Sequence, residues 1–203
     1  FDVPQWVPGL IVVAILTAVN LAQVKGFGEF EYWFAMIKIA VIVGFLIIGV
    51  LLWLGVLPAS GFIGFDNIRE SGFAPNGVAG IAAGLLAVAF AFGGIEVVTI
   101  AAAESEDPAD NVKRAVNSII WRIAIFYIGS VAVITLLLPY ASIDGADSAA
   151  DSPFTAVLEM ANIPGAAALM EVVIVLALLS AFNAQLYGTS RLGYQQALEG
   201  DAP

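Results

Sequence analysis

The sequence predicts an all-α integral membrane protein from its composition and from the length of its apolar segments. Of the 203 residues, 61% are hydrophobic and 12% are charged, and the mean hydropathy is +0.96. Ordinary soluble domains are about half apolar and about a quarter charged, so composition argues against a soluble fold. The apolar segments recur at the length of about 20 residues that a membrane-spanning helix needs.

The chain is predicted to form one transmembrane domain with five spans. Their approximate positions are residues 4–24, 32–57, 77–104, 116–140 and 166–197. Glycine-containing, proline-containing or charged connections separate them, as expected for loops. A short external helix is expected at about 153–160, because Ser152 can cap its first turn and Pro153 suits the first helical position.

The basic residues predict the orientation of the spans. If the chain crosses five times, one side collects Lys25, Lys113, Arg114, Arg122 and Arg191. Arg69 falls on the other side, and Lys38 lies within a span. Because cytoplasmic loops are enriched in Lys and Arg, we expect the N-terminal end of the chain outside and the C-terminal end in the cytoplasm of an inner (plasma) membrane protein.

The absence of two residue types limits the kinds of site that the chain can form. The sequence contains no Cys and no His, which excludes a disulfide framework, thiolate catalysis and the usual zinc sites. We therefore expect no metal and no cofactor. The chain opens with Phe1 and ends just past an apolar segment, so it is expected to be an internal piece of a longer polypeptide.

The stretch "FAFGGIEVVTIAAAE", residues 90–104, places Gly93 and Gly94 just before Glu96 inside an apolar segment. Two adjacent glycines allow a helix to break, and backbone freed inside a membrane must line a protected or wet cavity. Close helix packing is the alternative explanation for the glycines. Glu96 favours a functional site, because an ionisable group within a span is costly.

Lys38 is the second ionisable residue within a predicted span, and it has two interpretations. In one, its apolar stem lets the ammonium group reach back to the membrane surface. In the other, it is a buried ammonium that releases and regains a proton during a coupled cycle. The sequence does not decide between them.

Four stretches carry a resemblance to a known family. They are "VKGFGEFEYWFAMIKIAVI", "FAFGGIEVVTIAAAES", "NSIIWRIAIFYIGS" and "NAQLYGTSRLGYQQALEGDAP". In this order they resemble the amino acid permeases of the amino acid, polyamine and organocation (APC) superfamily. "EVVTIAAAES", "NSIIWRIAIFY" and "VLEMANIP" resemble the 4-aminobutyrate permease branch in particular.

The resemblance implies a twelve-helix fold with a five-plus-five inverted repeat of the leucine-transporter type. The five spans would be helices four to eight, and residues 77–104 would be the discontinuous sixth helix. Residues 152–164 would form the external loop that caps the outward vestibule. The other helices of the substrate site, helix one among them, would come from the rest of the polypeptide.

The resemblance also implies two groups of site residues. Substrate would bind at Phe90, Ala91, Phe92, Gly93, Gly94 and Glu96. Proton coupling would involve Lys38, Glu96, Ser180 and Asn183. Ser180 and Asn183 could equally be hydrogen-bonding contacts between helices. Other polar residues within spans are expected to make such contacts, namely Asn20, Thr99, Ser130 and Thr135.

The expected function is therefore secondary active transport by proton symport, not enzymatic catalysis. The substrate is expected to be 4-aminobutyrate or another neutral amino acid, and the expected partners are protons and the bilayer, without nucleic acid. The alternative is an integral membrane transferase that uses Glu104, Asp107 and Asp110 at the cytoplasmic rim. Pro108 interrupts that acidic cluster, which weakens the alternative.

Overall fold

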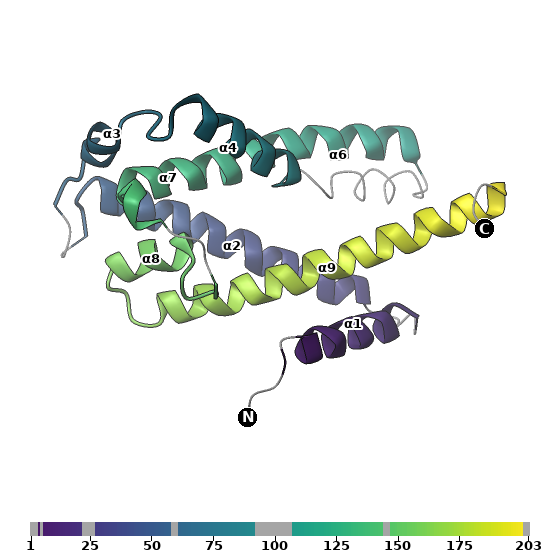
Figure 1. The fold of residues 1–203 in the computed structure, drawn as a ribbon. Helices are drawn as coiled ribbons and strands as arrows, with labels where there is room; N and C mark the ends of the chain where they lie inside the picture. Colours follow the sequence, from purple (N-terminus) through teal and green to yellow (C-terminus); the bar gives the residue numbers. More distant parts are fainter. Residues whose placement is uncertain are drawn as a thin grey trace.

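The computed structural model describes residues 4, 6–21, 27–57, 61–91, 107–143 and 147–200 (Figure 1). Throughout these ranges the regular structure is helical, and no strand occurs in them. The all-α class predicted from composition is confirmed for this part of the chain.

The described helices differ widely in length. They are α1 (Trp6–Leu21), α2 (Phe27–Trp53), α3 (Asp66–Ser71), α4 (Gly77–Ala91), α6 (Pro108–Arg122), the π-helical segment η1 (Ile123–Ile128), α7 (Gly129–Leu137), the 3-10 turn η2 (Tyr140–Ser142), α8 (Pro153–Met160) and α9 (Ala166–Glu199). Because α6, η1 and α7 follow one another without a break, they form one long helical rod (Figure 1).

Three of the described helices are long and apolar enough to cross a membrane. They are Tyr32–Trp53, Pro108–Leu137 and Ala166–Glu199. Helices α1 and α4 are equally apolar but shorter. The residues that follow them, 22–26 and 92–106, lie outside the described part of the chain. The five crossings and their limits therefore stay a prediction.

The apolar core lies where α2, α7, α8 and α9 meet, at one end of the long helices (Figure 1). Its most completely buried side chains include Phe45 and Leu52 of α2, Leu137 of α7 and Val157 of α8. The rings of Phe45 and Phe154 pack with their centroids 4.8 Å apart. Burial of this kind is what holds a short helix such as α8 in place, because eight residues are too few to form a stable helix alone.

The first turn of α8 is fixed by its own sequence. The Ser152 hydroxyl oxygen accepts a hydrogen bond from the Phe154 backbone N–H, and Pro153 occupies the first helical position. Thr155 is fully buried and donates its hydroxyl to the Ala149 carbonyl at 2.9 Å. The preceding loop is therefore tied to the helix that it leads into.

One side-chain amide and one indole hold the connection between α2 and α4 against the same end of the structure. Trp53 Nε1 donates to the Gly64 carbonyl at 2.7 Å, and Asn67 Nδ2 donates to the Leu136 carbonyl at 2.8 Å. The second bond satisfies a carbonyl in the last turn of α7, which has no partner within its own helix. Helix α3 is thereby held against the end of α7.

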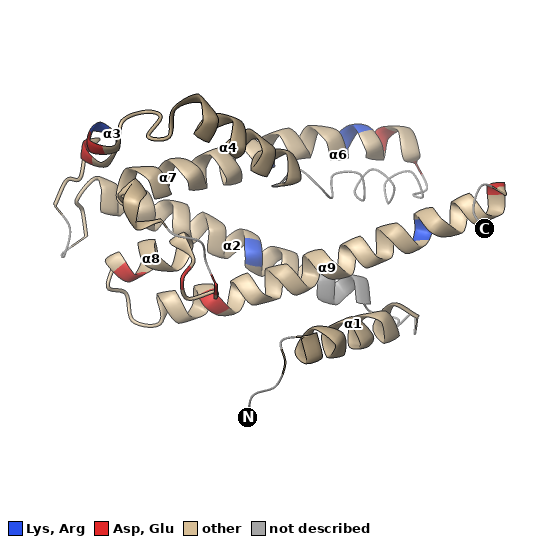
Figure 2. Ribbon diagram, viewed as in Figure 1, with Lys and Arg blue, Asp and Glu red and all other residues tan. Residues whose placement is uncertain are grey.

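Outside this core, many large apolar side chains are exposed. Trp6, Leu21 and Leu178 are 67%, 79% and 66% exposed, respectively. Charged residues are sparse along the described helices (Figure 2). Such a surface would promote aggregation in water, whereas it suits contact with lipid or with further apolar helices.

The π-helical segment η1 was not predicted from the sequence. Its residues, "IAIFYI", contain no glycine or proline, yet they adopt π-helical geometry in the middle of the rod. A π segment widens the helix locally and is often associated with functional sites. Gly129 follows η1 directly and faces Leu46 of α2. A Cβ atom added to Gly129 would lie 3.3 Å from the nearest atom of the Leu46 side chain.

Gly49 of α2 lies directly against Val133 of α7. A Cβ atom added to this buried glycine would collide with the branched side chain of Val133. Valine has little rotameric freedom in a helix, so it cannot turn aside cheaply. Gly49 therefore lets the two backbones pack at a distance that alanine would not permit.

We expect Gly49→Ala to destabilise the protein by about 1–3 kcal/mol, the usual range for overpacking a well-packed core. The measurement is the thermal unfolding midpoint of the purified protein in detergent. Gly44→Ala is the matched control, because Gly44 lies on the same helix with nothing within 4 Å of its added Cβ. Equal midpoints for the two variants would show that the approach of α2 to α7 does not depend on Gly49.

Candidate functional site

The candidate coupling residue Lys38 makes a hydrogen bond to another helix. Its Nζ donates to the Ser180 Oγ at 2.8 Å, which joins α2 to α9. Lys38 lies about 16 Å along α2 from Phe27, at about 1.5 Å per residue. The structure thus brings together two of the residues that the sequence analysis assigned to coupling.

A second interhelical bond lies beside the first. Asn20 Nδ2 of α1 donates to the Asn183 Oδ1 of α9 at 2.6 Å, and also to the Leu16 carbonyl of its own helix at 3.0 Å. Asn183 is only 4% exposed. The expectation that Asn20 forms a contact between helices is confirmed.

These two bonds meet on one turn of α9. Ser180 and Asn183 are three residues apart, a spacing that places side chains on the same face of a helix. Through this turn, α9 is bonded to α2 by Ser180 and to α1 by Asn183. We call Ser180 and Asn183, with their partners Lys38 and Asn20, the polar cluster.

The expectation for Thr135 was wrong. Its hydroxyl donates to the Val131 and Ala132 carbonyls of its own helix, at 2.8 and 3.1 Å, instead of reaching another helix. A threonine hydroxyl on a helix can always find a carbonyl one turn back, so its presence in a span does not indicate an interhelical bond. Ser130 is buried, at 5% exposure, and Thr99 lies outside the described residues.

The predicted substrate site is described only at its beginning. Phe90 lies in the last turn of α4 with its side chain 80% exposed, and Ala91 ends that helix. Phe92, Gly93, Gly94 and Glu96 lie outside the described residues. The assignment of these positions to substrate binding stays a prediction.

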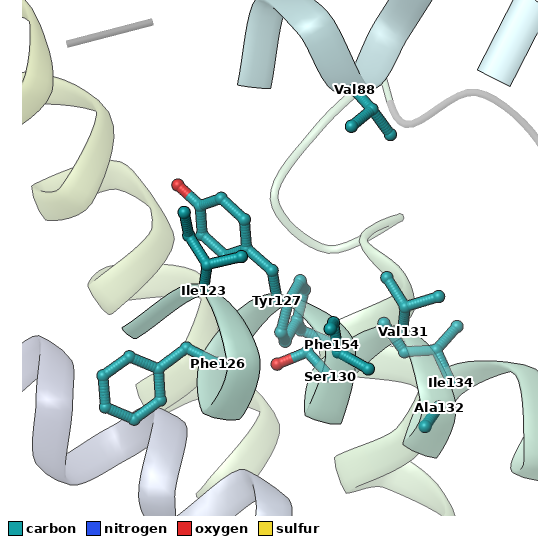
Figure 3. Close-up of a pocket in the computed structure, with 10 residues that line it drawn as sticks. Val88, Ile123, Phe126, Tyr127, Ser130, Val131, Ala132, Ile134 and Phe154 are labelled. Atoms are coloured by element: carbon teal, nitrogen blue, oxygen red, sulfur yellow. The ribbon is translucent and has the colours of Figure 1, made fainter. Parts of the chain in front are cut away.

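A cavity of about 620 Å³ lies between α4, η1, α7 and α8 (Figure 3). Its walls include Val88 of α4, Phe126 and Tyr127 of η1, and Phe154 of α8. Apart from the hydroxyls of Tyr127 and Ser130, the described side chains that line it are apolar, and none of them is charged. These described side chains could contact an apolar group, but they provide no charge to pair with the ionic ends of an amino acid.

Nothing in the spacing of the sequence identified this cavity. Several of its lining residues lie in η1, whose sequence contains no glycine or proline to indicate an irregular helix. The aromatic residues that line it are also common in membrane helices, so their presence alone predicts packing.

The acidic residues proposed for a transferase have a simpler explanation in the structure. Asp107 directly precedes α6 and Asp110 lies in its first turn, where negative charge favours the positive end of the helix dipole. Glu104 lies outside the described residues. Within the described ranges, no group of three or more Asp or Glu side chains could hold a metal ion.

The bond between Asn20 and Asn183 is testable by a double-mutant cycle. We expect Asn20→Ala and Asn183→Ala to be non-additive by about 0.6 kcal/mol, the average for side-chain hydrogen bonds between membrane helices. The free energies of unfolding of the two single variants and the double variant provide the measurement.

Thr189→Ala combined with Asn20→Ala is the control cycle, because the Thr189 hydroxyl bonds only to carbonyls of its own helix, those of Gln185 and Leu186, in the described structure. This control pair should be additive. If the changes in unfolding free energy of Asn20→Ala and Asn183→Ala were also additive, the hydrogen bond between these residues would contribute nothing to stability.

Comparisons with known proteins place the chain in a family. All of residues 1–203 match the amino acid permease family model. The chain is 62% identical to an aromatic amino acid transport protein of Corynebacterium glutamicum, over 100% of this chain and 44% of the relative. It is 42% identical to a gamma-aminobutyric acid permease of Bacillus subtilis, over 100% of this chain and 42% of the relative. It is 38% identical to the lysine-specific permease of Escherichia coli, again over 100% of this chain and 42% of the relative.

No solved structure matches the chain. The chain spans less than half the length of the curated relatives named above. These relatives are all named as permeases or transport proteins, so the transferase alternative has no support among them. Because the family model matches every residue, the chain belongs to the amino acid permease family of the APC superfamily, and its long apolar helices fit a multi-pass membrane protein.

Proposed function

We propose that this chain is part of a secondary active transporter that moves a small neutral amino acid across the inner membrane. The observation that carries this proposal is the family match over residues 1–203. Because the relatives are more than twice as long, the proposal includes further helices of the same polypeptide. Those helices would complete the substrate site.

The proposed architecture is the twelve-helix, five-plus-five inverted repeat, with this chain providing helices four to eight. In it, residues 77–104 form the discontinuous sixth helix, and α4 is the half that precedes the break. The distribution of Lys and Arg supports a cytoplasmic C-terminal end. The side that carries α8 would then face outward.

The substrate would be held at the break by Phe90, Ala91, Phe92, Gly93, Gly94 and Glu96. The two half-helix ends formed by a break carry opposite partial charges, which complement the carboxylate and ammonium groups of an amino acid. Glycine at Gly93 and Gly94 would permit the required backbone angles and leave room for the substrate.

Among neutral amino acids, we favour an aromatic substrate over 4-aminobutyrate. The relative that is 62% identical is named for aromatic amino acid transport, whereas the gamma-aminobutyric acid permease of Bacillus subtilis is 42% identical. Both substrates fall within the class expected from the sequence.

We further propose that transport is driven by protons, with Lys38 as the group that exchanges them. Its hydrogen bond to Ser180 supports this role. A hydroxyl accepts a hydrogen bond from an ammonium group and can donate one to a neutral amine. The contact between α2 and α9 can therefore persist, with its direction reversed, when the lysine loses its proton.

Lys38→Arg should abolish accumulation of substrate under an imposed pH gradient, because arginine keeps its proton and cannot complete the cycle. Lys38→Ala should retain exchange without net uphill uptake. The measurement is uptake by the full-length permease in proteoliposomes, with counterflow in the absence of a gradient as the second readout.

Lys113→Arg is the matched control, because Lys113 lies on α6, near the end where that helix begins, outside the polar cluster. It should accumulate substrate as the unaltered protein does. Normal gradient-driven accumulation by Lys38→Arg would contradict the coupling role. Lys38 would then be a residue whose ammonium group only reaches the membrane surface.

Competition uptake tests the substrate. Phenylalanine, tyrosine and tryptophan should each compete with the transported amino acid at concentrations at least about tenfold lower than 4-aminobutyrate, a difference of about 1.4 kcal/mol in binding. Lysine should compete poorly. A stronger effect of 4-aminobutyrate than of any aromatic amino acid would reverse the preference, and no competition by either class would contradict transport of a neutral amino acid.

A further inference from the structure

A groove of about 520 Å³ lies between the last turn of α1 and the final third of α9. Its polar lining residues are Thr17 and Asn20 of α1 and Tyr187, Ser190, Arg191 and Tyr194 of α9. Among the described residues that line it, none is Asp or Glu. This part of the lining combines the positive charge of Arg191 with several hydroxyls, which suits an anion.

The length of α9 places this groove at the surface of the bilayer. The helix has 34 residues and is about 51 Å long at about 1.5 Å per residue, whereas the hydrocarbon core is about 30 Å thick. About 20 residues, counted from Ala166, cross that core. The residues from Tyr187 onward then lie at the level of the lipid headgroups, where Tyr and Arg are expected.

Arg191 is held at the edge of the groove. Its guanidinium carbon lies 5.2 Å from the centroid of the Tyr187 ring, within the range of a cation–π contact. Among the described residues, no carboxylate forms an ion pair with it. The ring orients the guanidinium group without neutralising its charge, which leaves its N–H donors for a ligand.

The other donors can be counted from the hydrogen bonds. Asn20 uses both amide hydrogens, on Leu16 and Asn183, and the Ser190 hydroxyl donates to the Tyr187 carbonyl at 2.8 Å. Together with Arg191, the hydroxyls of Thr17 and Tyr194 are thus the groups in the lining best placed to donate to an anion. A tetrahedral phosphate, with several acceptor oxygens, matches a guanidinium group flanked by hydroxyls.

We propose that this groove binds the phosphodiester headgroup of an anionic phospholipid. The apolar part of the lining, Leu21 and Leu186, favours a lipid over free phosphate, because it provides surface for the acyl chains. Basic pockets between membrane helices are a recurrent way of binding such headgroups. The side chain of Leu21 is 79% exposed, so the apolar surface continues from the groove along the outside of α1.

The test is lipid retention by the full-length permease, purified in detergent and measured by native mass spectrometry with added phosphatidylglycerol or phosphatidylcholine. Phosphatidylglycerol should bind more tightly than phosphatidylcholine, and Arg191→Gln should weaken its binding about tenfold. Arg122→Gln is the matched control, since Arg122 is an exposed arginine at the end of α6 outside the groove, and it should bind phosphatidylglycerol normally.

Tyr194→Phe provides a second, milder variant, which removes one hydroxyl and keeps the ring. It should reduce phosphatidylglycerol binding by a smaller factor. Equal binding of phosphatidylglycerol by Arg191→Gln, Arg122→Gln and the unaltered protein would overturn the proposal. Displacement of bound phosphatidylglycerol by millimolar inorganic phosphate would also overturn it, because the site would then recognise a free anion.

Discussion

Polar side chains inside apolar helices need hydrogen-bond partners, and those that cannot be satisfied within their own helix must find them on neighbouring helices. The described structure meets this constraint on one turn of α9. Ser180 accepts from Lys38 of α2, and Asn183 accepts from Asn20 of α1. Each such bond contributes on average only about 0.6 kcal/mol in a membrane bundle. Their main effect is to fix the orientation of α9, because apolar contacts alone would let this helix rotate about its axis or slide against its neighbours.

This polar cluster separates two different regions of the structure. On one side of it, α2, α7, α8 and α9 enclose the apolar core, with Val157 fully buried and Gly49 allowing close contact with Val133. On the other side, α1 and α9 leave an open groove lined by hydroxyls and Arg191.

The sequence was sufficient for the helical class and for the family, but not for the pairing of side chains. Composition and apolar segment length indicate membrane helices, and Ser152 with Pro153 marks the start of α8, because these signals are local. Which residue meets Lys38 or Asn20 depends on how helices far apart in the sequence are rotated, and single-sequence periodicity does not contain that information. The π-helical geometry of η1 was missed for the same reason, since isoleucine, phenylalanine and tyrosine accept ordinary helical geometry equally well.

The central claim, that one turn of α9 faces both α1 and α2, is best tested by cross-linking. The chain contains no cysteine, so in the full-length permease, with any other cysteines replaced, introduced pairs report distance directly. Lys38→Cys with Ser180→Cys, and Asn20→Cys with Asn183→Cys, should each be joined rapidly by a short bifunctional thiol reagent. Ile47→Cys with Ser180→Cys should not, because Ile47 lies about 14 Å further along α2. Cross-linking of the Ile47 pair as fast as the other two, or of neither expected pair, would contradict the arrangement.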